Sequence, residues 1–398
     1  MSVHVQVVVS RAVGRRVSGA ETRARLLLCY DRMRSCFAVA LLLPIAACVS
    51  ALPGESVRVI DAGVADAPVV DAADGSTPRE AGVDAPPLAP LRGVRSIVAG
   101  ESHTCVLLDD GTVRCWGKVA GPSGALPVLA PVPVPGITNA VQVAAGPDHT
   151  CALLGDGRVL CSRGVYERAR LELEGVVSVA AGASFTCAVF ADRTARCGSA
   201  VPLAGVTTIA AGYDFACATL TDSTARCWGA NMFGQLGSGA ISDRSDTPVP
   251  VMGDSGFVAM AANNYRACAI LGSGTVSCWG FVRYSHEVAA APTTVAAIGD
   301  AVQIAVGGNH ACVVLANGAV RCWGAGFLGQ LGDGGRVEWT PAPSSDVPGI
   351  AGARAVATGI THSCVALSDG TARCWGTGYL GNNTLSGTSL VPVVVVAP

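Results

Sequence analysis

The segment Cys105-Val-Leu-Leu-Asp-Asp-Gly-Thr-Val-Arg-Cys115, followed by Trp116-Gly117, places two cysteines nine residues apart around an Asp-Gly pair. The same cysteine spacing recurs along the rest of the chain. The seven copies account for fourteen of the seventeen cysteines. The further pairs are Cys151/Cys161, Cys187/Cys197, Cys217/Cys227, Cys268/Cys278, Cys312/Cys322 and Cys364/Cys374.

Each copy has the pattern of a β-hairpin. Asp-Gly or Asn-Gly between two apolar runs is the strongest short-range hairpin signal. A turn residue stands five positions after the first cysteine of each copy: Asp110, Asp156, Asp192, Asp222, Ser273, Asn317 and Asp369. With the turn at this position, the two cysteines of a copy face each other across antiparallel strands.

The facing cysteines favour one disulfide per hairpin. Residues opposed in an antiparallel pair have Cα atoms roughly 4.5–5.5 Å apart, which is within the disulfide range. Free thiols and metal binding are the alternatives. Zinc sites favour closer spacing and sets of four ligands, which isolated pairs do not supply.

Histidine, phenylalanine or arginine stands two positions before each first cysteine. The residues are His103, His149, Phe185, Phe215, Arg266, His310 and His362. A Cys–His pair can serve nucleophilic catalysis. A catalytic pair would occur once, however, and here the histidine recurs four times and is replaced by phenylalanine twice. We therefore interpret these residues as packed, structural side chains.

Arginine and tryptophan flank the second cysteine in most copies. Arg114, Arg196, Arg226, Arg321 and Arg373 precede it, and Trp116, Trp228, Trp279, Trp323 and Trp375 follow it. Residues two apart on a strand point to the same side, so we expect each arginine to pack on the indole or to bond to a neighbouring unit. A ring of arginines that binds a ligand is the alternative.

The complete repeat is an apolar strand ending in Ala-Ala-Gly, a short polar segment, the hairpin, and then Trp-Gly. Two copies continue with Gly234-Gln-Leu-Gly237 and Gly329-Gln-Leu-Gly332. This pattern resembles the regulator-of-chromosome-condensation repeat over residues 92–398. The resemblance implies an all-β fold, a seven-bladed β-propeller of short antiparallel sheets.

Further strands and a closure are expected for such a ring. Ala130–Val134 and Thr247–Val251 are expected to be outer strands. Val391–Val396 is expected to complete the first blade and close the ring. The second and third units depart from the repeat and are expected to be trimmed.

The N-terminal part predicts export. Residues 37–47 are apolar but too few to span a bilayer, which needs roughly 20 residues. The ending Ile45-Ala-Ala-Cys48 resembles a bacterial lipobox and implies lipidation of Cys48. We interpret 33–48 as a lipoprotein signal peptide that starts at Met33, and 1–32 as untranslated or non-structural. Residues 49–91, rich in Asp, Ala, Pro and Val, predict a disordered stalk.

Composition restricts the functions. The formal net charge is −2 with 14% charged residues, which argues against nucleic acid as a partner. The cysteine pairs favour an oxidising location, namely the bacterial cell envelope facing outside the cytoplasm. We expect no cofactor and no metal. We also expect membrane contact only through the lipid anchor, and a monomer.

The most favoured function is a non-enzymatic, surface-anchored propeller that binds a protein or glycan through loops between blades. An inhibitor of an extracellular hydrolase, such as a β-lactamase or protease, is the alternative. An enzyme with its site in the axial channel is a third, less favoured possibility, because no unique catalytic set is present. Candidate contact residues are Trp339, Tyr284 and Arg336, which lie in loops that do not repeat.

Overall fold

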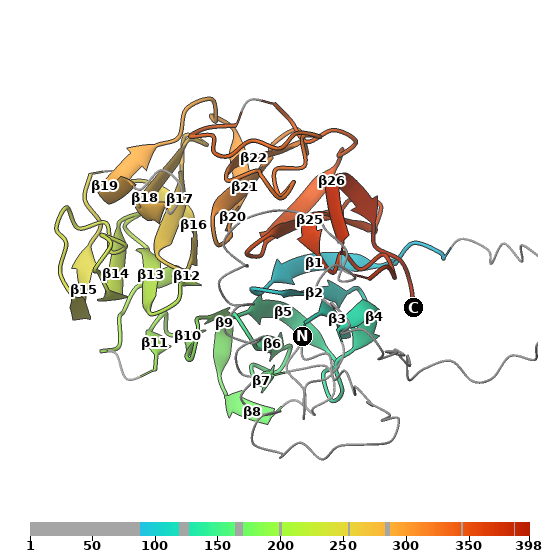
Figure 1. The fold of residues 1–398 in the computed structure, drawn as a ribbon. Coiled ribbons are helices and arrows are strands. Elements are labelled where there is room, and N and C mark those ends of the chain that lie inside the picture. The colour runs from blue at the N-terminus through green and yellow to red at the C-terminus, as the bar shows by residue number, and fades with distance from the viewer. Residues whose placement is uncertain are drawn as a thin grey trace, which may run out of the picture. The chain divides into compact units, whose positions relative to one another are not determined.

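Seven antiparallel sheets surround a central axis (Figure 1). The computed structural model describes residues 88–118, 127–163, 170–198, 201–253, 255–282, 287–343, 345–385 and 387–398. No helix long and apolar enough to cross a membrane occurs in these ranges. The predicted signal peptide, Cys48 and the predicted stalk up to residue 87 lie outside them.

The sheets follow one another along the chain as blades 1 to 7. Blade 1 is β1 (Val94–Ala99), β2 (His103–Leu108), β3 (Val113–Gly117) and β4 (Val128–Pro133), and blade 2 is β5 (Ala140–Ala145), β6 (Thr150–Leu154), β7 (Val159–Ser162) and β8 (Arg170–Leu173). Blade 3 is β9 (Val176–Ala181), β10 (Thr186–Phe190) and β11 (Ala195–Cys197), and blade 4 is β12 (Val206–Ala211), β13 (Phe215–Leu220), β14 (Ala225–Ala230) and β15 (Arg244–Pro250).

The second half of the ring has the same order. Blade 5 is β16 (Phe257–Asn263), β17 (Arg266–Leu271), β18 (Val276–Val282) and β19 (Glu287–Thr294), and blade 6 is β20 (Ala301–Val306), β21 (His310–Leu315) and β22 (Val320–Gly324). Blade 7 is β23 (Ala353–Thr358), β24 (His362–Leu367), β25 (Ala372–Gly378) and β26 (Gly387–Val394). The first strand of each blade lies nearest the axis (Figure 1).

The predicted seven-bladed propeller is therefore confirmed, and so is the hairpin in every repeat. The second and third strands of each blade pair so that the two cysteines lie opposite each other, as in the register Cys105↔Cys115.

All seven predicted cysteine pairs form disulfides, one in each blade. They are Cys105–Cys115, Cys151–Cys161, Cys187–Cys197, Cys217–Cys227, Cys268–Cys278, Cys312–Cys322 and Cys364–Cys374. The first cysteines are fully buried, and the second cysteines are buried except Cys161, which is half-buried. The free-thiol and metal alternatives for these fourteen residues are therefore set aside.

The expected Cα–Cα separation of the paired cysteines needs a small correction. The Cα atoms are 4.0–4.1 Å apart in every pair. This separation is slightly below the expected range and nearest to that of a non-hydrogen-bonded pair of an antiparallel ladder, in which the side chains lie closest.

The hairpin turn explains the Asp-Gly signal. The Asp110 carboxylate accepts hydrogen bonds from the backbone N–H and the hydroxyl of Thr112, at 2.9 and 2.6 Å. The next residue, Gly111, has φ 76°, a region that favours glycine. Its carbonyl accepts a bond of 2.9 Å from Ala140 N at the start of the next blade. The turn thus both closes its hairpin and fastens the neighbouring blade.

The same backbone hydrogen bond between a hairpin turn and the start of the next blade also closes the ring. Val94 N at the start of blade 1 donates to Gly370 O in the turn of blade 7, at 2.9 Å. Across this interface Thr104 Oγ1 and His362 Nε2 are 2.8 Å apart. Blade 7 therefore contacts blade 1 as any other blade contacts the next.

Two expectations about strands need correction, and a third is met. The C-terminal strand β26 does not complete the first blade, because it pairs with β25 as the outer strand of blade 7. Only the residues after β26 contact the segment that precedes blade 1, where Leu91 N donates to Val395 O at 2.9 Å. Blade 2 is not short of a strand, since β8 is present. Blade 3 does have three strands, as expected of a trimmed unit.

Blade 6 also has only three strands, which the repeat pattern does not reveal. The segment that could form a fourth strand contains Pro341 and Pro343. Pairing there stops at a single bridge between Gly324 and Thr340. Proline alone does not explain this, because the fourth strands β4, β15, β19 and β26 also contain proline.

Candidate functional site

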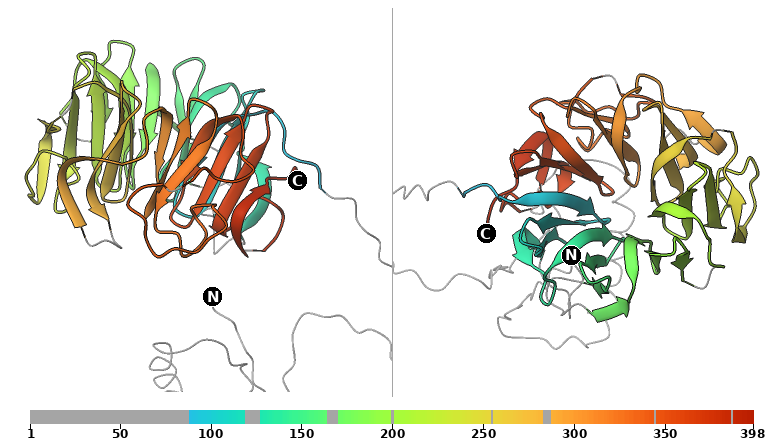
Figure 2. Two further views of the ribbon diagram at one scale, coloured as in Figure 1. Left: turned by 90° about the horizontal axis from the view of Figure 1, so that it is seen from above. Right: turned by 180° about the vertical axis from the view of Figure 1, so that it is seen from behind.

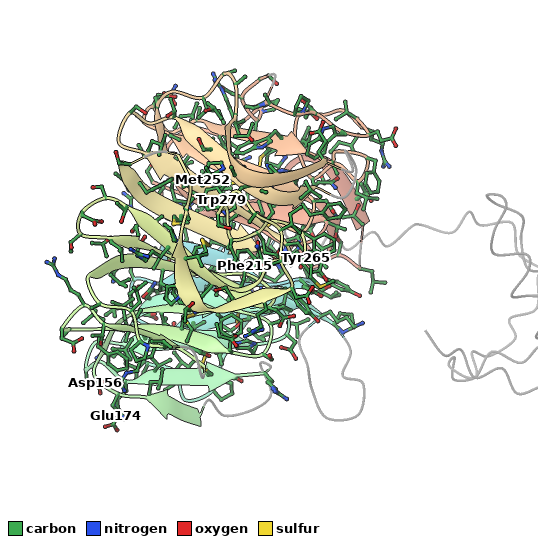
Figure 3. The ribbon with its side chains drawn as sticks, turned by 90° about the vertical axis from the view of Figure 1, so that its left-hand side faces the viewer. Asp156, Glu174, Phe215, Met252, Tyr265 and Trp279 are labelled. Atoms are coloured by element: carbon green, nitrogen blue, oxygen red, sulfur yellow. A yellow bond between two sulfur atoms is a disulfide. The ribbon has the colours of Figure 1, made fainter. Side chains whose placement is uncertain are left out.

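The strands of each blade alternate in direction, so the segments that connect them lie on two opposite faces of the ring (Figure 2). The hairpin turns and the connections between blades lie on one face, which we call the turn face. The turns after each innermost strand and the loops after each third strand lie on the other, which we call the loop face. In the side view of Figure 3, Asp156 and Glu174 of the turn face lie to the left, and Tyr265 of the loop face lies to the right.

The histidines of the repeat are structural, as expected. His103 Nε2 lies 3.0 Å from Thr150 Oγ1, and His310 Nε2 lies 2.7 Å from Ser363 Oγ. Both bonds link one blade to the next. Burial lowers the pKa of His103 to about 4, that of His310 to about 3 and that of His362 to about 4, so these rings are neutral near pH 7.

Arg266 stands where the other blades have histidine or phenylalanine. The residue is buried, with 8% of its surface exposed, and its Nε and Nη1 have no hydrogen-bond partner in the described part of the chain. Desolvation lowers its pKa to about 10. The residue that precedes the first cysteine in the next blade is Ala311, which offers no acceptor side chain. Arg266 is thus a buried cation without a counter-ion among the residues that the structure describes.

The expected packing of arginines on the repeat tryptophans is not found among the described residues. The one stacked arginine there is Arg196, whose Cζ lies 5.0 Å from the Phe190 ring centroid in its own blade. Arg321 bonds instead to Asp346 at 2.6 Å and to Ala297 O at 2.9 Å. Arg321 thus makes the expected bond to a neighbouring segment.

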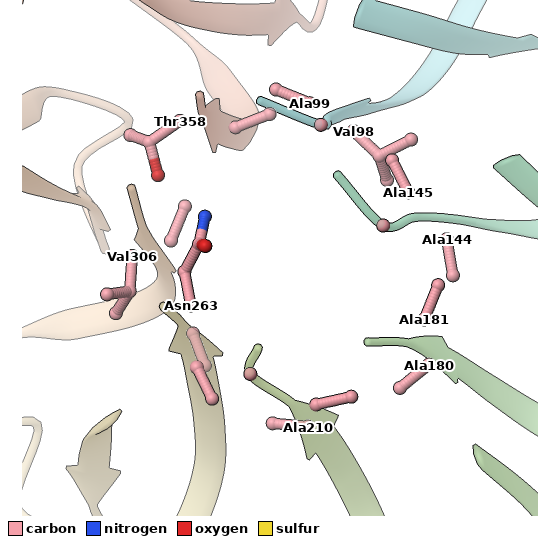
Figure 4. A pocket seen from close by; sticks show the side chains of 18 of the residues that line it. Val98, Ala99, Ala144, Ala145, Ala180, Ala181, Ala210, Asn263, Val306 and Thr358 are labelled. Carbon is pink, nitrogen blue, oxygen red and sulfur yellow. The ribbon is translucent and has the colours of Figure 1, made fainter. Parts of the chain in front are cut away.

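The axial channel is a cavity of about 340 Å³ (Figure 4). Its wall consists mainly of alanine and valine from the ends of the innermost strands, and the polar exceptions are Glu101, Gln142, Asn263, Gln303 and Thr358. No group of three or more His, Cys, Asp or Glu able to hold a metal occurs among the residues that the structure describes. The channel wall therefore supplies small apolar surface, amide and hydroxyl groups and the carboxylate of Glu101.

Two of the three predicted contact residues lie in the described ranges, and both are in the loop after β22. Trp339 is partly buried. Its ring packs close to Gly324, where an added Cβ atom would lie 3.2 Å from it. Arg336 is exposed and donates to Phe327 O at 3.3 Å. Tyr284 falls outside the described residues.

A cluster of aromatic rings on the loop face was not predicted. The Phe233 ring lies 4.9 Å from that of Tyr265 and 5.0 Å from that of Phe281, and Tyr213 lies 6.3 Å from Tyr265, between ring centroids. Tyr213 and Tyr265 are each 39% exposed, and the adjacent Met232 is 62% exposed. We call Tyr213, Met232, Phe233, Tyr265 and Phe281 the aromatic patch.

The patch arises from three loops and the end of strand β18, in blades 4 and 5. Tyr213 and Tyr265 follow the innermost strands β12 and β16, and Tyr213 N donates to Asn264 O at 3.1 Å, which holds these two turns together. Phe233 comes from the loop after β14, and Phe281 lies in β18. The sequence signal available was the placement of tyrosine in turns that carry no aromatic residue in the other blades, at Tyr213 and Tyr265.

The sequence repeats have a known counterpart. Residues 94–118, 140–162, 206–235 and 301–330 match the family model described as "Regulator of chromosome condensation (RCC1) repeat". The chain contains RCC1 repeats. The matched segments lie in blades 1, 2, 4 and 6, and the other three blades have the same hairpin with its disulfide.

Solved structures are similar to this chain at low identity. Human WBSCR16 is 19% identical with a TM-score of 0.59, over 68% of this chain and 85% of that one. Prp20p from Saccharomyces cerevisiae is 18% identical with a TM-score of 0.48, over 76% of each chain. The ectodomain of the receptor kinase CR4 from Physcomitrella patens is 21% identical with a TM-score of 0.48, over 73% of this chain and 74% of that one. No curated protein sequence matches the chain.

Proposed function

We propose that this protein is a non-enzymatic binding module that engages a protein partner through the aromatic patch of its loop face. We also propose that it is displayed from the cell envelope by a lipid on Cys48 and the stalk 49–91. The seven disulfides indicate an oxidising compartment, which supports export.

The aromatic patch is the observation that carries the proposal. Only 5% of the residues are aromatic, and all five tryptophans of the repeat are buried, yet four Phe and Tyr rings meet at one surface position. Large aromatic side chains supply much of the binding energy at protein interfaces. Their exposure on loops, held by a rigid ring, is typical of a recognition surface.

The geometry of the rings favours a protein over a glycan. The Tyr213–Tyr265 and Phe233–Tyr265 ring planes are inclined at 46° and 49°. Inclined rings form an uneven apolar surface, whereas stacking on the flat face of a sugar needs an open ring face. Met232 adds a flexible apolar side chain of the kind used to fit protein partners.

The predicted contact residues belong to a second region of the same face. Arg336 is exposed and can add a polar contact. Trp339 contributes less in this proposal, because part of its ring already packs on Gly324. Tyr284 lies outside the described residues and stays a prediction from the sequence.

The test is retention of a partner from cell-envelope extract by the purified protein and by the double variant Tyr213→Ala, Tyr265→Ala. We expect the double variant to retain at least tenfold less partner, since truncating interface aromatics costs roughly 2 kcal/mol or more. Val302→Ala is the matched control, because Val302 is 58% exposed at the start of β20, on the turn face.

Three outcomes decide the test. A partner lost with the double variant and kept with Val302→Ala supports the proposal. Equal retention by both variants rules out the aromatic patch. Retention that survives protease treatment of the extract but not glycosidase treatment shows a glycan partner and overturns the protein assignment.

A further inference from the structure

Loops after the third strands cover the tryptophans of the next blade. Trp279 Nε1 donates to Gln235 O at 3.0 Å, and Trp375 Nε1 donates to Gln330 O at 2.9 Å. Each acceptor belongs to a Gly-Gln-Leu-Gly loop of the preceding blade. The leucines of these loops, Leu236 and Leu331, are buried with 1% and 3% of their surfaces exposed.

The fit between loop and indole is close. A Cβ atom on Gly237 would lie 2.8 Å from Trp279 Nε1, and one on Gly332 would lie 2.6 Å from Trp375 Nε1. Only glycine allows the loop backbone to come this near. Blade 7 covers Trp116 of blade 1 in a related way, since a Cβ on Gly381 would lie 2.9 Å from its indole nitrogen.

None of the described residues forms such a loop over Trp228 of blade 4. Blade 3 ends its third strand at Cys197, and Leu203 already pairs with Ala195 through bonds of 2.7 and 3.1 Å. Only residues 198–202 separate these positions in the sequence, whereas residues 231–243 form the covering loop of blade 4. Trp228 is 4% exposed, and the indole nitrogens that are buried without a hydrogen-bond partner among the described residues are those of Trp116 and Trp323.

A cavity of about 240 Å³ occupies the place of the missing loop. Phe185, Phe215, Trp228 and Gly198 form its wall, and the exposed residues Asp214 and Arg244 stand at its edge. Figure 3 marks Phe215. Pockets for drug-sized ligands measure roughly 300–1,000 Å³, so this one has room for one or two side chains. Its size matches a loop tip rather than a cofactor.

We propose that this cavity is a docking site for a loop of a partner protein, which takes the place of the Gly-Gln-Leu-Gly loop that blade 3 lacks. The incoming loop supplies a backbone carbonyl to Trp228 Nε1 and a leucine-like side chain to the aromatic wall. The site differs from the aromatic patch, so the inference stands apart from the proposed function.

The probe is a peptide with the sequence of the chain's own loop, Asn231-Met-Phe-Gly-Gln-Leu-Gly237, blocked at both ends. The 15N-labelled protein shows one indole N–H resonance per tryptophan, and Trp228→Phe identifies that of Trp228. We expect this resonance to move and saturate on titration while those of the other tryptophans in the propeller stay. A peptide with Leu236→Ala should bind more than tenfold more weakly, as expected from truncation of a buried leucine.

Matched variants separate docking from a general effect. Ser184 is exposed at the edge of the cavity, and Ser102 occupies the same position in blade 1. Ser184→Trp should abolish the response to the peptide, and Ser102→Trp should leave it intact. No movement of the Trp228 resonance at millimolar peptide, or an equal response to both peptides, would overturn the inference. The double variant Tyr213→Ala, Tyr265→Ala should still bind the peptide, so the two proposals fail independently.

Discussion

Two positions vary together around the ring at the interfaces between blades. The residue two places before a first cysteine is histidine wherever the next blade has Ser or Thr directly before its own first cysteine. It is Phe or Arg wherever the next blade has Ala. The pairs are His103/Thr150, His149/Thr186, Phe185/Ala216, Phe215/Ala267, Arg266/Ala311, His310/Ser363 and His362/Thr104. Hydrogen bonds in three of them show why, since a buried imidazole needs a partner.

The pair His310/Ser363 provides a test by substitution. Ser363→Ala leaves His310 Nε2 buried without an acceptor or donor, and should lower the free energy of unfolding by about 1–3 kcal/mol. Adding His310→Phe reproduces the Phe215/Ala267 pair and should recover most of that loss. Urea unfolding of the two variants measures both effects. A double variant no more stable than Ser363→Ala would contradict the pairing.

The same double variant changes the pH dependence. An unfolded histidine has a pKa of about 6.5, whereas burial lowers the pKa of His310 to about 3. Between these values the unfolded state binds the proton and the folded state does not, so stability falls as the pH drops. From pH 7 to pH 5 the double variant should therefore lose about 2 kcal/mol less stability than the parent protein. An equal loss would show that His310 is protonated in the folded ring.

At the scale of elements, strands differ in how far the repeat specifies them. The hairpin is the same in every blade because it carries the cysteines and the turn residue. The fourth strand is absent from blades 3 and 6. Outer strands pair on one side only, so their loss removes fewer contacts, and in blade 3 the connection is too short to form one. These are the elements that the repeat predicts least well.

The C-terminal strand is the outer strand whose loss should matter most. Deleting residues 388–398 removes most of β26 together with Val395, which is fully buried and whose carbonyl accepts from Leu91 N. We expect the melting temperature to fall by at least about 10 °C, on the scale of 2–4 °C per kcal/mol. Val391→Ala is the control, because Val391 is 46% exposed. A melting temperature that survives the deletion would show that blade 7 and the ring do not need this strand.

At the scale of the whole molecule, one disulfide per blade makes the fold depend on its compartment. Fourteen of the seventeen cysteines are paired, and the remaining three are Cys29, Cys36 and Cys48. Closing a loop of this size is worth about 3 kcal/mol in the chain-entropy model. A hairpin already restricts the chain, so the gain per disulfide is smaller than this.

Counting thiols on denatured, unreduced protein tests pairing and export together. With Cys48 lipidated, we expect zero to two free thiols. Reduction before the assay provides the control, because it should release the fourteen paired cysteines. Many free thiols in protein taken from the native host would contradict an oxidising location.

Local patterns in the sequence were enough for the repeat, the hairpin, the cysteine pairing and the number of blades. Each depends on residues a few positions apart, and a turn such as Asp110-Gly111 relates its neighbours by a fixed geometry. The structural role of the histidines also followed, because a residue that recurs in a ring has a repeated environment.

Contacts between distant loops required the tertiary structure. The aromatic patch joins Tyr213, Phe233 and Tyr265, whose separation in sequence carries no sign that their rings meet. The cavity at Trp228 lies where the short connection of blade 3 leaves this tryptophan of blade 4 without a covering loop in the described part of the chain. The effect of that short connection becomes apparent only when the two blades pack together. Repetition therefore predicts what all blades share, whereas the candidate sites arise where neighbouring blades differ.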